Sequence, residues 1–374
     1  MDYAAATPVD TAVMKAMQPY FSDVFYNPSA TYEPARKARD AINEAKAEIA
    51  GTMGVKPAEL VLTSGGTEAN NLAIQGAMSR YPGKKILTSA VEHESVLEPA
   101  KQWNFVEIPV NSQGIIDAGK AAAMIDDDVV MVSVMLANNE VGAIQPVKDL
   151  AAEMEKIRKK RKARKISTTL ILHTDAAQAP LYLDVHPHRL GADLLTVNGG
   201  KIYGPKQSAA LYVRAGIRLE PLMRGGGQQR GLRSGTESPA SAAGLAEALK
   251  LAQKKRNPES KRLSELRYYF FSQLKKRFPN AKINGPRKRR LPNNVHVTLP
   301  GNDNERLINL LDERGIMAAA GSACSAANAE PSHVLRSMGI SDADAQASLR
   351  FTMGRGTTKE KIDRTVEVLA EIAD

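Results

Sequence analysis

Between residue 34 and about residue 250, the chain alternates helix-like patterns with short apolar runs. Pro34 stands where it can open a helix, and apolar residues follow it at spacings of four, three and four: Ala38, Ile42, Ala45 and Ile49. Strand-like apolar runs occupy 60–63, 85–89, 129–136, 169–173, 194–197 and 209–213. Short apolar strands separated by helices are typical of a mainly parallel sheet with helices on both faces.

The pattern changes after Pro239, where longer helical stretches and fewer strands follow. We expect helices at 240–256, 261–277, 305–314 and 359–372, and strands at 294–299 and 349–352. The last helix has one apolar face, formed by Ile362, Val366, Leu369 and Ile372. We therefore predict an α/β protein with a large domain at 16–250 and a smaller α+β domain built from 1–15 and 251–374.

Length and composition narrow the class of protein. The chain has 374 residues, of which 43% are hydrophobic and 25% charged, so it is globular and long enough for two domains. No apolar stretch approaches about 18 residues, and the first residues, MDYAAATPVD, lack the pattern of a signal peptide. The single cysteine, Cys324, excludes an intrachain disulfide and a multi-cysteine metal site. These limits fit a cytoplasmic enzyme.

Positive charge is concentrated in two runs. The net charge is +10, while 158–165 (RKKRKARK) carries seven basic residues and 287–290 (RKRR) carries four, so the rest of the chain is nearly neutral. Such runs can bind nucleic acid or another polyanion. We favour a solvated helix end and a solvated loop, because few aromatic residues are near the runs to stack on bases.

A glycine turn, SGGTEANN at 64–71, follows the first strand-like run. Such a turn exposes backbone N–H groups at the positive end of a helix dipole, where a phosphate can bind. Gly66 and Thr67 would lie in the first turn, and the Thr67 hydroxyl would add a donor. A plain N-capped helix accounts for the segment equally well, and no lysine follows to complete a Walker motif.

Two further motifs follow later strand-like runs. Asp175, in HTDAAQ, would lie at the carboxyl end of its strand, where open α/β sheets bind ligands. It could cap a helix or pair with a protonated ring nitrogen, and Gln178 could donate to a neighbouring oxygen. Lys201 follows two glycines in VNGGKIYGPK, which leaves its amine uncrowded for a Schiff base. It could equally be a solvated loop lysine, and Lys206 has a similar claim.

The order of phosphate turn, aspartate and lysine on successive strands indicates a pyridoxal 5'-phosphate (PLP) enzyme. The sequence resembles the cysteine desulfurases of the NifS/IscS type, in the class V aminotransferase family of fold type I PLP enzymes. The resemblance runs nearly end to end, through MDYAAATPVD, NPSATYEPARKAR, SGGTEANNLAI, VEHESVL, ANNEVGAIQPV, HTDAAQ, GGKIYGPK and RGGGQQRGLRSGTES. Its most specific segments are GSACSAA…EPSHVLRSMG and SLRFTMGRGTT. The cysteine loop followed by PSHVL separates this group from aminotransferases generally.

The resemblance implies a mainly parallel seven-stranded sheet in the large domain and a small domain that carries the catalytic-cysteine loop. It also implies cofactor contacts. Lys201 would bind PLP as a Schiff base, and Asp175 would pair with the pyridinium nitrogen. His93 would stack on the ring and relay protons, and Gln178 would bond the phenolic oxygen. The other implied contacts are Gly66, Thr67 and Asn198 with the phosphate, Asn139 with cofactor and substrate, and Thr236 with the phosphate of the other subunit.

The resemblance also assigns the substrate carboxylate to Arg350 and the substrate sulfur to Cys324, so Lys201, Cys324 and His93 would be catalytic. The planar fork of an arginine matches a carboxylate, although Arg350 could instead form a surface salt bridge. Cys324 lies among small residues in AGSACSAANAE, unlike a buried structural cysteine. An exposed thiol can become a thiolate and attack sulfur. His93 could also be a core histidine.

Four positions depart from the usual family pattern. Gly200 stands where a histidine usually precedes the Schiff-base lysine, and Asn198 replaces a serine that contacts the phosphate. Gln228 and Tyr32 replace histidines of the GGGH and NPSS segments. The basic run at 158–165 is longer and more charged than usual. These changes bear on PLP affinity and rate more than on the reaction class.

We therefore predict a PLP-dependent L-cysteine desulfurase, a sulfurtransferase that forms L-alanine and leaves sulfur as a persulfide on Cys324. Selenocysteine lyase or another class V activity is the alternative enzyme, and a catalytically weakened docking scaffold is the non-enzymatic one. The resemblance implies a homodimer and a sulfur acceptor such as an iron–sulfur scaffold protein or a tRNA-thiolation relay. We expect no metal site, no membrane partner and no direct binding of nucleic acid.

Overall fold

The large domain is built on a seven-stranded sheet. In the computed structural model, which describes residues 1–321 and 331–373, the strand order is β1-β7-β6-β5-β4-β2-β3. Six strands run in the same direction, and only β7, among the described residues of this sheet, is antiparallel to its neighbours, β1 and β6. The strand bounds are β1 Leu60–Thr63, β2 Lys85–Ser89, β3 Asn104–Ile108, β4 Val129–Ser133, β5 Ile171–Asp175, β6 Leu194–Asn198 and β7 Ala209–Val213. The predicted mainly parallel sheet is confirmed.

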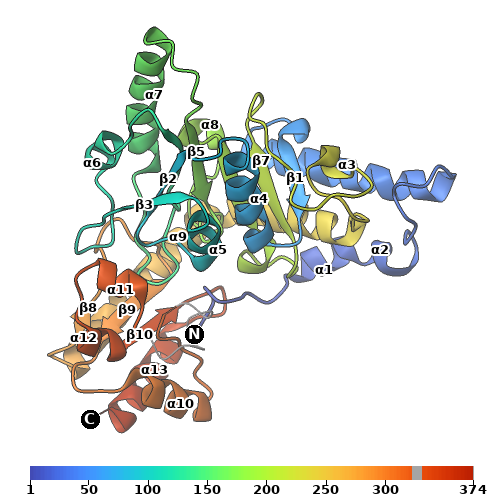
Figure 1. Ribbon diagram of the computed structural model, residues 1–374. Helices are drawn as coiled ribbons and strands as arrows, with labels where there is room; N and C mark the ends of the chain where they lie inside the picture. The colour runs from blue at the N-terminus through green and yellow to red at the C-terminus, as the bar shows by residue number, and fades with distance from the viewer. Residues whose placement is uncertain (322–330, 374) are drawn as a thin grey trace.

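Helices cover both faces of this sheet, as Figure 1 shows. On one face lie α4 (Gly66–Met78) and α5 (Glu94–Ala100), whose apolar residues form one core cluster with the sheet. On the other lie α3 (Glu33–Met53), α7 (Val147–Ala163) and the first half of α9 (Pro239–Arg277). The shorter helices are α1 (Thr11–Met17), α2 (Pro19–Ser22), α6 (Ala118–Ala123) and α8 (Pro187–Leu190). Because both faces are covered, β4, β5 and β7 are buried along their whole length.

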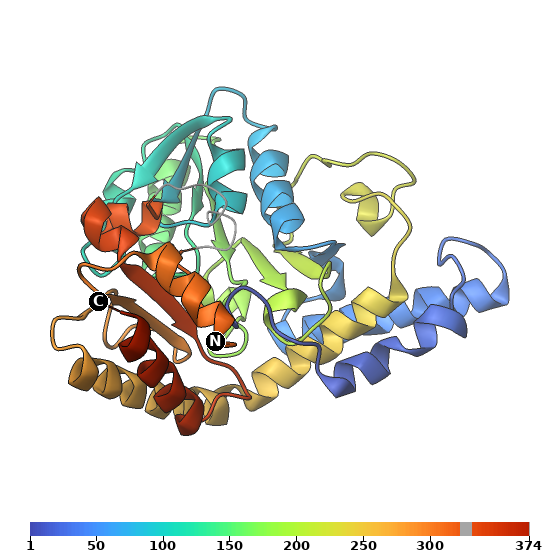
Figure 2. The ribbon, with the colours of Figure 1, turned by 90° about the horizontal axis from the view of Figure 1, so that it is seen from below.

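Helix α9 corrects one prediction. The expected pair of helices at 240–256 and 261–277 is a single helix of 39 residues that contains Pro258. Leu249 packs in the core before the proline, and Leu263 and Phe270 pack after it, so packing on both sides offsets the roughly 3 kcal/mol that an interior proline costs. Figure 2 shows α9 running from the large domain to the side of α13.

The small domain has an antiparallel sheet of three strands in the order β10-β9-β8. Its bounds are β8 Lys282–Ile283, β9 Asn294–Thr298 and β10 Ser348–Thr352. Helices α10 (Asn304–Glu313) and α13 (Lys359–Ile372) match the prediction closely, and α11 (His333–Ser337) and α12 (Asp342–Gln346) lie between them in the sequence. Within the described residues, no helix is long and apolar enough to cross a membrane.

The N-terminal segment, residues 1–10, connects the two sheets. Met1 O accepts from Thr352 N at 2.8 Å, and Tyr3 N donates to Thr352 O at 3.3 Å, so the segment begins beside β10. It then reaches the large domain, where Thr7 N donates to Gly200 O at 3.2 Å. The residues between these anchors therefore cross from one domain to the other.

Candidate active site

A cavity of about 200 Å³ lies at the carboxyl ends of the central strands, where the two domains and the N-terminal segment meet. Nine of the residues singled out by sequence line it: Gly66, Thr67, His93, Asn139, Asp175, Gln178, Asn198, Lys201 and Arg350. Ala4, Ala5, Asn70, Ser95, Met135, Ala137 and Ala177 complete the wall. The structure thus brings together residues that span nearly the whole chain.

Two predicted residues are not in this wall. Thr236 is exposed and lines a separate hollow beside Gln229 and Arg233. Cys324 lies outside the described residues.

Asp175 ends β5, and hydrogen bonds hold both of its carboxylate oxygens. Oδ1 accepts from Ala177 N at 2.8 Å, and Oδ2 accepts from Asn70 Nδ2 at 2.7 Å. The side chain is buried at one end of the cavity. A carboxylate fixed in this way suits a protonated ring nitrogen.

Sequence reasoning missed Asn70. It belongs to the SGGTEANN segment and lies four residues after Gly66, so both face the same side of α4. Its Oδ1 atom is buried with no hydrogen-bond partner among the described residues. The sequence did offer one indication that Asn70 is functional: its polar amide lies among small and apolar residues on a helix face that is buried.

The start of α4 forms an anion cradle. The N-cap residue is Gly65, which has no side chain to accept hydrogen bonds from the first N–H groups of the helix. These N–H groups therefore stay available to an anion. Asn198 ends β6 opposite this turn, and a Cβ built on Gly66 would lie 3.2 Å from Asn198 Nδ2. Glycine at this position therefore keeps open a space flanked by helix N–H groups and an amide donor, which fits a phosphate.

Lys201 lies at the end of a short 3-10 helix, η2 (Gly199–Lys201), which the Asn198 side chain caps through Gly200 N at 3.1 Å. The Lys201 ammonium donates to Ala5 O of the N-terminal segment at 2.5 Å. Lys206 is exposed, and its Nζ donates to Thr7 O at 2.7 Å outside the cavity wall. The two lysines with a similar claim to the cofactor therefore differ in position, because Lys201 lines the cavity and Lys206 does not.

Arg350 enters the cavity from β10. Its side chain is only 2% exposed, and Nη2 lies 2.8 Å from Oδ1 of Asp2. Nη1 donates to Asn139 O at 3.3 Å. The expected alternative of a surface salt bridge is wrong, because this arginine is buried at the domain junction.

Histidine and amide groups line the rest of the wall. His93 is the N-cap of α5, and its Nδ1 accepts from Ser95 N at 3.1 Å. Gln178 Nε2 donates to Ala4 O at 3.0 Å. With these groups, the wall provides a lysine amine, a carboxylate, an anion cradle and a buried guanidinium, a donor set that fits PLP and an amino acid.

Two buried groups behind the wall have perturbed acidity. Burial raises the pKa of Glu92 well above its usual value, and the neighbouring charge of Asp175 adds to the effect. Burial lowers the pKa of His173 to about 3, and its ring bonds the Ser133 hydroxyl at 2.8 Å. Burial thus favours the neutral form of the Glu92 carboxyl, and His173 is neutral at pH 7.

The first basic run is partly structural, which corrects the expectation of a wholly solvated helix end. Arg161 is 3% exposed and donates to the carbonyl oxygens of Asp126, Val129 and Thr168. Arg158 pairs with buried Asp193 at 2.5 Å. The lysines of the run, Lys159, Lys160, Lys162 and Lys165, are exposed as expected.

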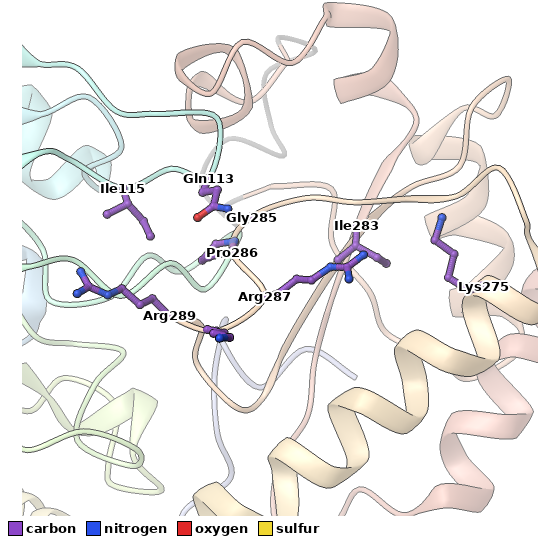
Figure 3. A pocket seen from close by; sticks show the side chains of 9 residues that line it. Gln113, Ile115, Lys275, Ile283, Gly285, Pro286, Arg287 and Arg289 are labelled. Carbon is purple, nitrogen blue, oxygen red and sulfur yellow. The ribbon is translucent and has the colours of Figure 1, made fainter.

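The second basic run lies in a turn between β8 and β9. Arg287, Lys288 and Arg289 line a hollow of about 510 Å³ together with Lys275 of α9. Figure 3 shows Arg287, Arg289 and Lys275 around this hollow. Arg290, by contrast, is buried, and burial lowers its pKa to about 9. The expected solvated loop is thus confirmed for three of the four residues and wrong for Arg290.

Comparison with known proteins identifies the family. Residues 1–365 match the family model of the class-V aminotransferases. The cysteine desulfurase IscS of Dictyoglomus turgidum is 40% identical over all of this chain and 94% of its own length. The cysteine desulfurase IscS 1 of Archaeoglobus fulgidus is 40% identical over all of this chain and 96% of its own. A solved NifS-like protein is 30% identical, with a TM-score of 0.89 over 99% of this chain and 98% of that one.

Proposed function

Because this chain belongs to the class-V aminotransferase family and is a PLP-dependent cysteine desulfurase, we propose that the cavity holds PLP and L-cysteine and that Cys324 takes the sulfur. PLP, when bound, supplies an electron sink for the carbanion at the substrate Cα. The observation that carries the assignment is that Lys201, Asp175 and Arg350 line one cavity although they come from two domains.

The cofactor contacts follow from what each group offers. Asp175 keeps the ring nitrogen protonated, because opposite charges favour both ionised forms. The N–H groups at Gly66 and Thr67, with the Asn198 amide, bind the phosphate. Lys201 would hold the cofactor covalently until the amine of cysteine displaces it, which frees the Lys201 amine for proton transfer. His93 would pack against the ring, and Gln178 would donate to its phenolic oxygen.

The substrate steps use three side chains. Arg350 binds the carboxylate of cysteine and so orients its Cα towards Lys201. The Lys201 amine takes the Cα proton and later returns a proton to carbon. The Cys324 thiolate attacks the substrate sulfur. As the new S–S bond forms, the Cβ–S bond breaks and leaves its electrons on the carbon skeleton, which is protonated to alanine.

The selenocysteine lyase alternative is not favoured, because the full-length relatives are named cysteine desulfurases. A docking scaffold that lacks activity also has less support. It would rest on the departures from the family pattern at Gly200 and Asn198, yet Asn198 flanks the anion cradle and Lys201 lies in the wall.

We further propose a homodimer in which Thr236 contacts the phosphate in the partner's site. Large apolar side chains near the N-terminus support it, since Phe21 and Phe25 are 67% and 64% exposed and Tyr32 is 52% exposed. Tyr26 stacks on Phe25 and lies edge-on to Tyr32, so these aromatic side chains form one group, as at surfaces that a partner covers. Sedimentation at micromolar concentration should give a dimer, and Phe21→Asp with Phe25→Asp should weaken it. A monomer with full activity would contradict this proposal.

The proposed acceptor of the persulfide sulfur is an iron–sulfur scaffold protein or a tRNA-thiolation relay, as the IscS names of the relatives suggest. We propose the cytoplasm as the compartment, because a single cysteine used as a reactive thiol suits a reducing environment.

The experiment that tests the proposed function measures alanine and sulfide together. The PLP-loaded protein, given L-cysteine and a small thiol reductant, should release the two products in equal amounts. Arg350→Lys should raise KM for cysteine, because an ammonium cannot replace the planar fork. An Arg350→Lys enzyme with unchanged KM would remove Arg350 from carboxylate binding.

A further inference from the structure

The only carboxylate paired with Arg350 among the described residues comes from the far end of the chain. Asp2 Oδ1 lies 2.8 Å from Arg350 Nη2, although the two residues are 348 positions apart. Arg350 is almost fully buried, and without Asp2 its charge would have no carboxylate within bonding distance in the described ranges, 1–321 and 331–373. A buried guanidinium without a counter-charge destabilises the folded protein. Without a fixed partner, its side chain would also not keep one orientation.

Backbone bonds fix Asp2 beside the strand that carries Arg350. Thr352, two residues after Arg350 on β10, donates its N–H to Met1 O and accepts from Tyr3 N. Its hydroxyl also accepts from Ala4 N at 2.8 Å. The Asp2 carboxylate is therefore anchored on both sides and acts as a fixed point for the guanidinium.

The two contacts of Arg350 leave donors for a substrate. A guanidinium has five N–H groups. One goes to Asp2 and one to Asn139 O, while Nε has no partner among the described residues. A carboxylate in the cavity can thus bind while the Asp2 contact remains.

We propose that Asp2 is a positioning residue for substrate binding. The Asp2 carboxylate holds the Arg350 guanidinium in the direction that binding of the cysteine carboxylate needs. The inference rests on the proposed role of Arg350. Asp2 does not touch the substrate in this arrangement. Its effect passes through Arg350, so it should appear in the affinity for carboxylates and not in cofactor binding or proton transfer.

The same segment offers a matched control. Asp10 forms an ion pair with Arg355 at 2.5 Å, and both residues are partly buried, but neither lines the cavity. Replacing Asp10 removes a comparable pair from the N-terminal segment. A loss of affinity specific to Asp2 would therefore not come from a general loosening of that segment.

The test measures KM and kcat for L-cysteine in the PLP-loaded enzyme, and the affinity for two ligands by titration of the cofactor absorbance. Asp2→Ala should raise KM about tenfold, which is about 1.4 kcal/mol, with kcat within about twofold of the wild-type value. L-Alanine affinity should fall by the same factor. Cysteamine has an amine and a thiol but no carboxylate, so its affinity should not change. Asp10→Ala should leave all of these values unchanged.

Asp2→Asn keeps the oxygen acceptor and loses the charge, so KM should rise less, about threefold. If Asp2→Ala does not fold, the KM of Asp2→Asn tests the positioning role of Asp2 instead. An unchanged or lower KM in Asp2→Asn, or an equal loss of cysteamine affinity, would overturn the inference. The proposed role of Arg350 in binding the substrate carboxylate has its own test, and an unchanged KM for cysteine in Arg350→Lys would reject it. A raised KM there with a normal KM in the Asp2 variants would reject only the role of Asp2.

Discussion

The side-chain amide of Asn70, on the first helix after the glycine turn, donates a 2.7 Å hydrogen bond to the carboxylate of Asp175 at the end of β5. The same amide donates to Ser95 Oγ at 2.9 Å. Ser95 in turn contacts His93 Nδ1 at 2.9 Å. One asparagine therefore links the groups that we propose to hold the nitrogen and the face of the cofactor ring.

Asn70→Leu keeps the size of the side chain and removes this link. A hydrogen bond to a charged group contributes about 1.5–3 kcal/mol, so PLP affinity should fall by about tenfold or more. Titration of the PLP-free protein with PLP measures the effect. Asn71→Leu is the matched control, since within the described part of the chain Asn71 Nδ2 bonds only Thr67 O, at 2.9 Å along the helix. Equal affinities in the two variants would contradict a special role for Asn70.

Lys201→Ala should abolish the absorbance of covalently bound PLP, at roughly 400–430 nm for a PLP–lysine Schiff base, while the protein stays folded. Lys206→Ala should keep it, because Lys206 is exposed and outside the cavity wall. Both lysines bond carbonyl oxygens of the N-terminal segment, so each variant loses one such contact. Loss of the absorbance in Lys206→Ala alone would reverse the assignment.

Arg161→Leu should destabilise the protein by about 3 kcal/mol, because it leaves buried carbonyl oxygens without a donor. Replacing the exposed Lys159, Lys160, Lys162 and Lys165 by Gln removes more charge, yet the free energy of unfolding should change by only about 0.5 kcal/mol. Urea unfolding compares the two. The quadruple variant should also keep its turnover of cysteine with a small reductant. If it is the less stable of the two, the structural role of Arg161 is wrong.

Acid should weaken the fold through His173. Its pKa is about 3 in the folded protein and 6.5 when exposed, so below pH 6.5 the unfolded state takes up the proton first. The stability that His173 contributes is thus complete above pH 6.5 and is lost as the pH falls towards 3. The free energy of unfolding of the wild type minus that of His173→Gln should rise with pH across this window and stay constant above it. A difference that does not vary with pH would contradict the lowered pKa, because it would mean that the pKa of His173 is the same in the folded and unfolded states.

Local patterns were enough to predict most of the scaffold. The helix opened by Pro34 follows from apolar residues spaced by three and four, which lie on its buried face. The short strands follow from continuous apolar runs, because strands covered on both faces of a sheet are buried at successive positions. The same reasoning divided α9 at Pro258, where packing against both domains outweighs the local cost. A short stretch of sequence does not show which of its side chains will be buried against segments far away in the chain.

The candidate site shows the same limit. Nine residues chosen from motifs line one cavity, and eight of them lie at or shortly after the carboxyl ends of large-domain strands, which meet at one edge of the sheet. The ninth, Arg350, comes from the middle of β10 in the small domain. Asn70 and Asp2 were not found, since their partners lie 105 and 348 positions away. Arg161 looked like one charge among seven, and only the three-dimensional course of the chain shows the carbonyl oxygens around it.

The most direct test of the central claim is mass spectrometry of the PLP-loaded enzyme after reaction with L-cysteine in the absence of reductant. Cys324 is the only cysteine of the chain, so the position of a bound sulfur is unambiguous. We predict that the peptide containing Cys324 gains the mass of one sulfur atom, with one alanine formed per chain, and that Cys324→Ala binds PLP and cysteine but gains no sulfur. Alanine and sulfide production by Cys324→Ala at the wild-type rate would contradict the persulfide route.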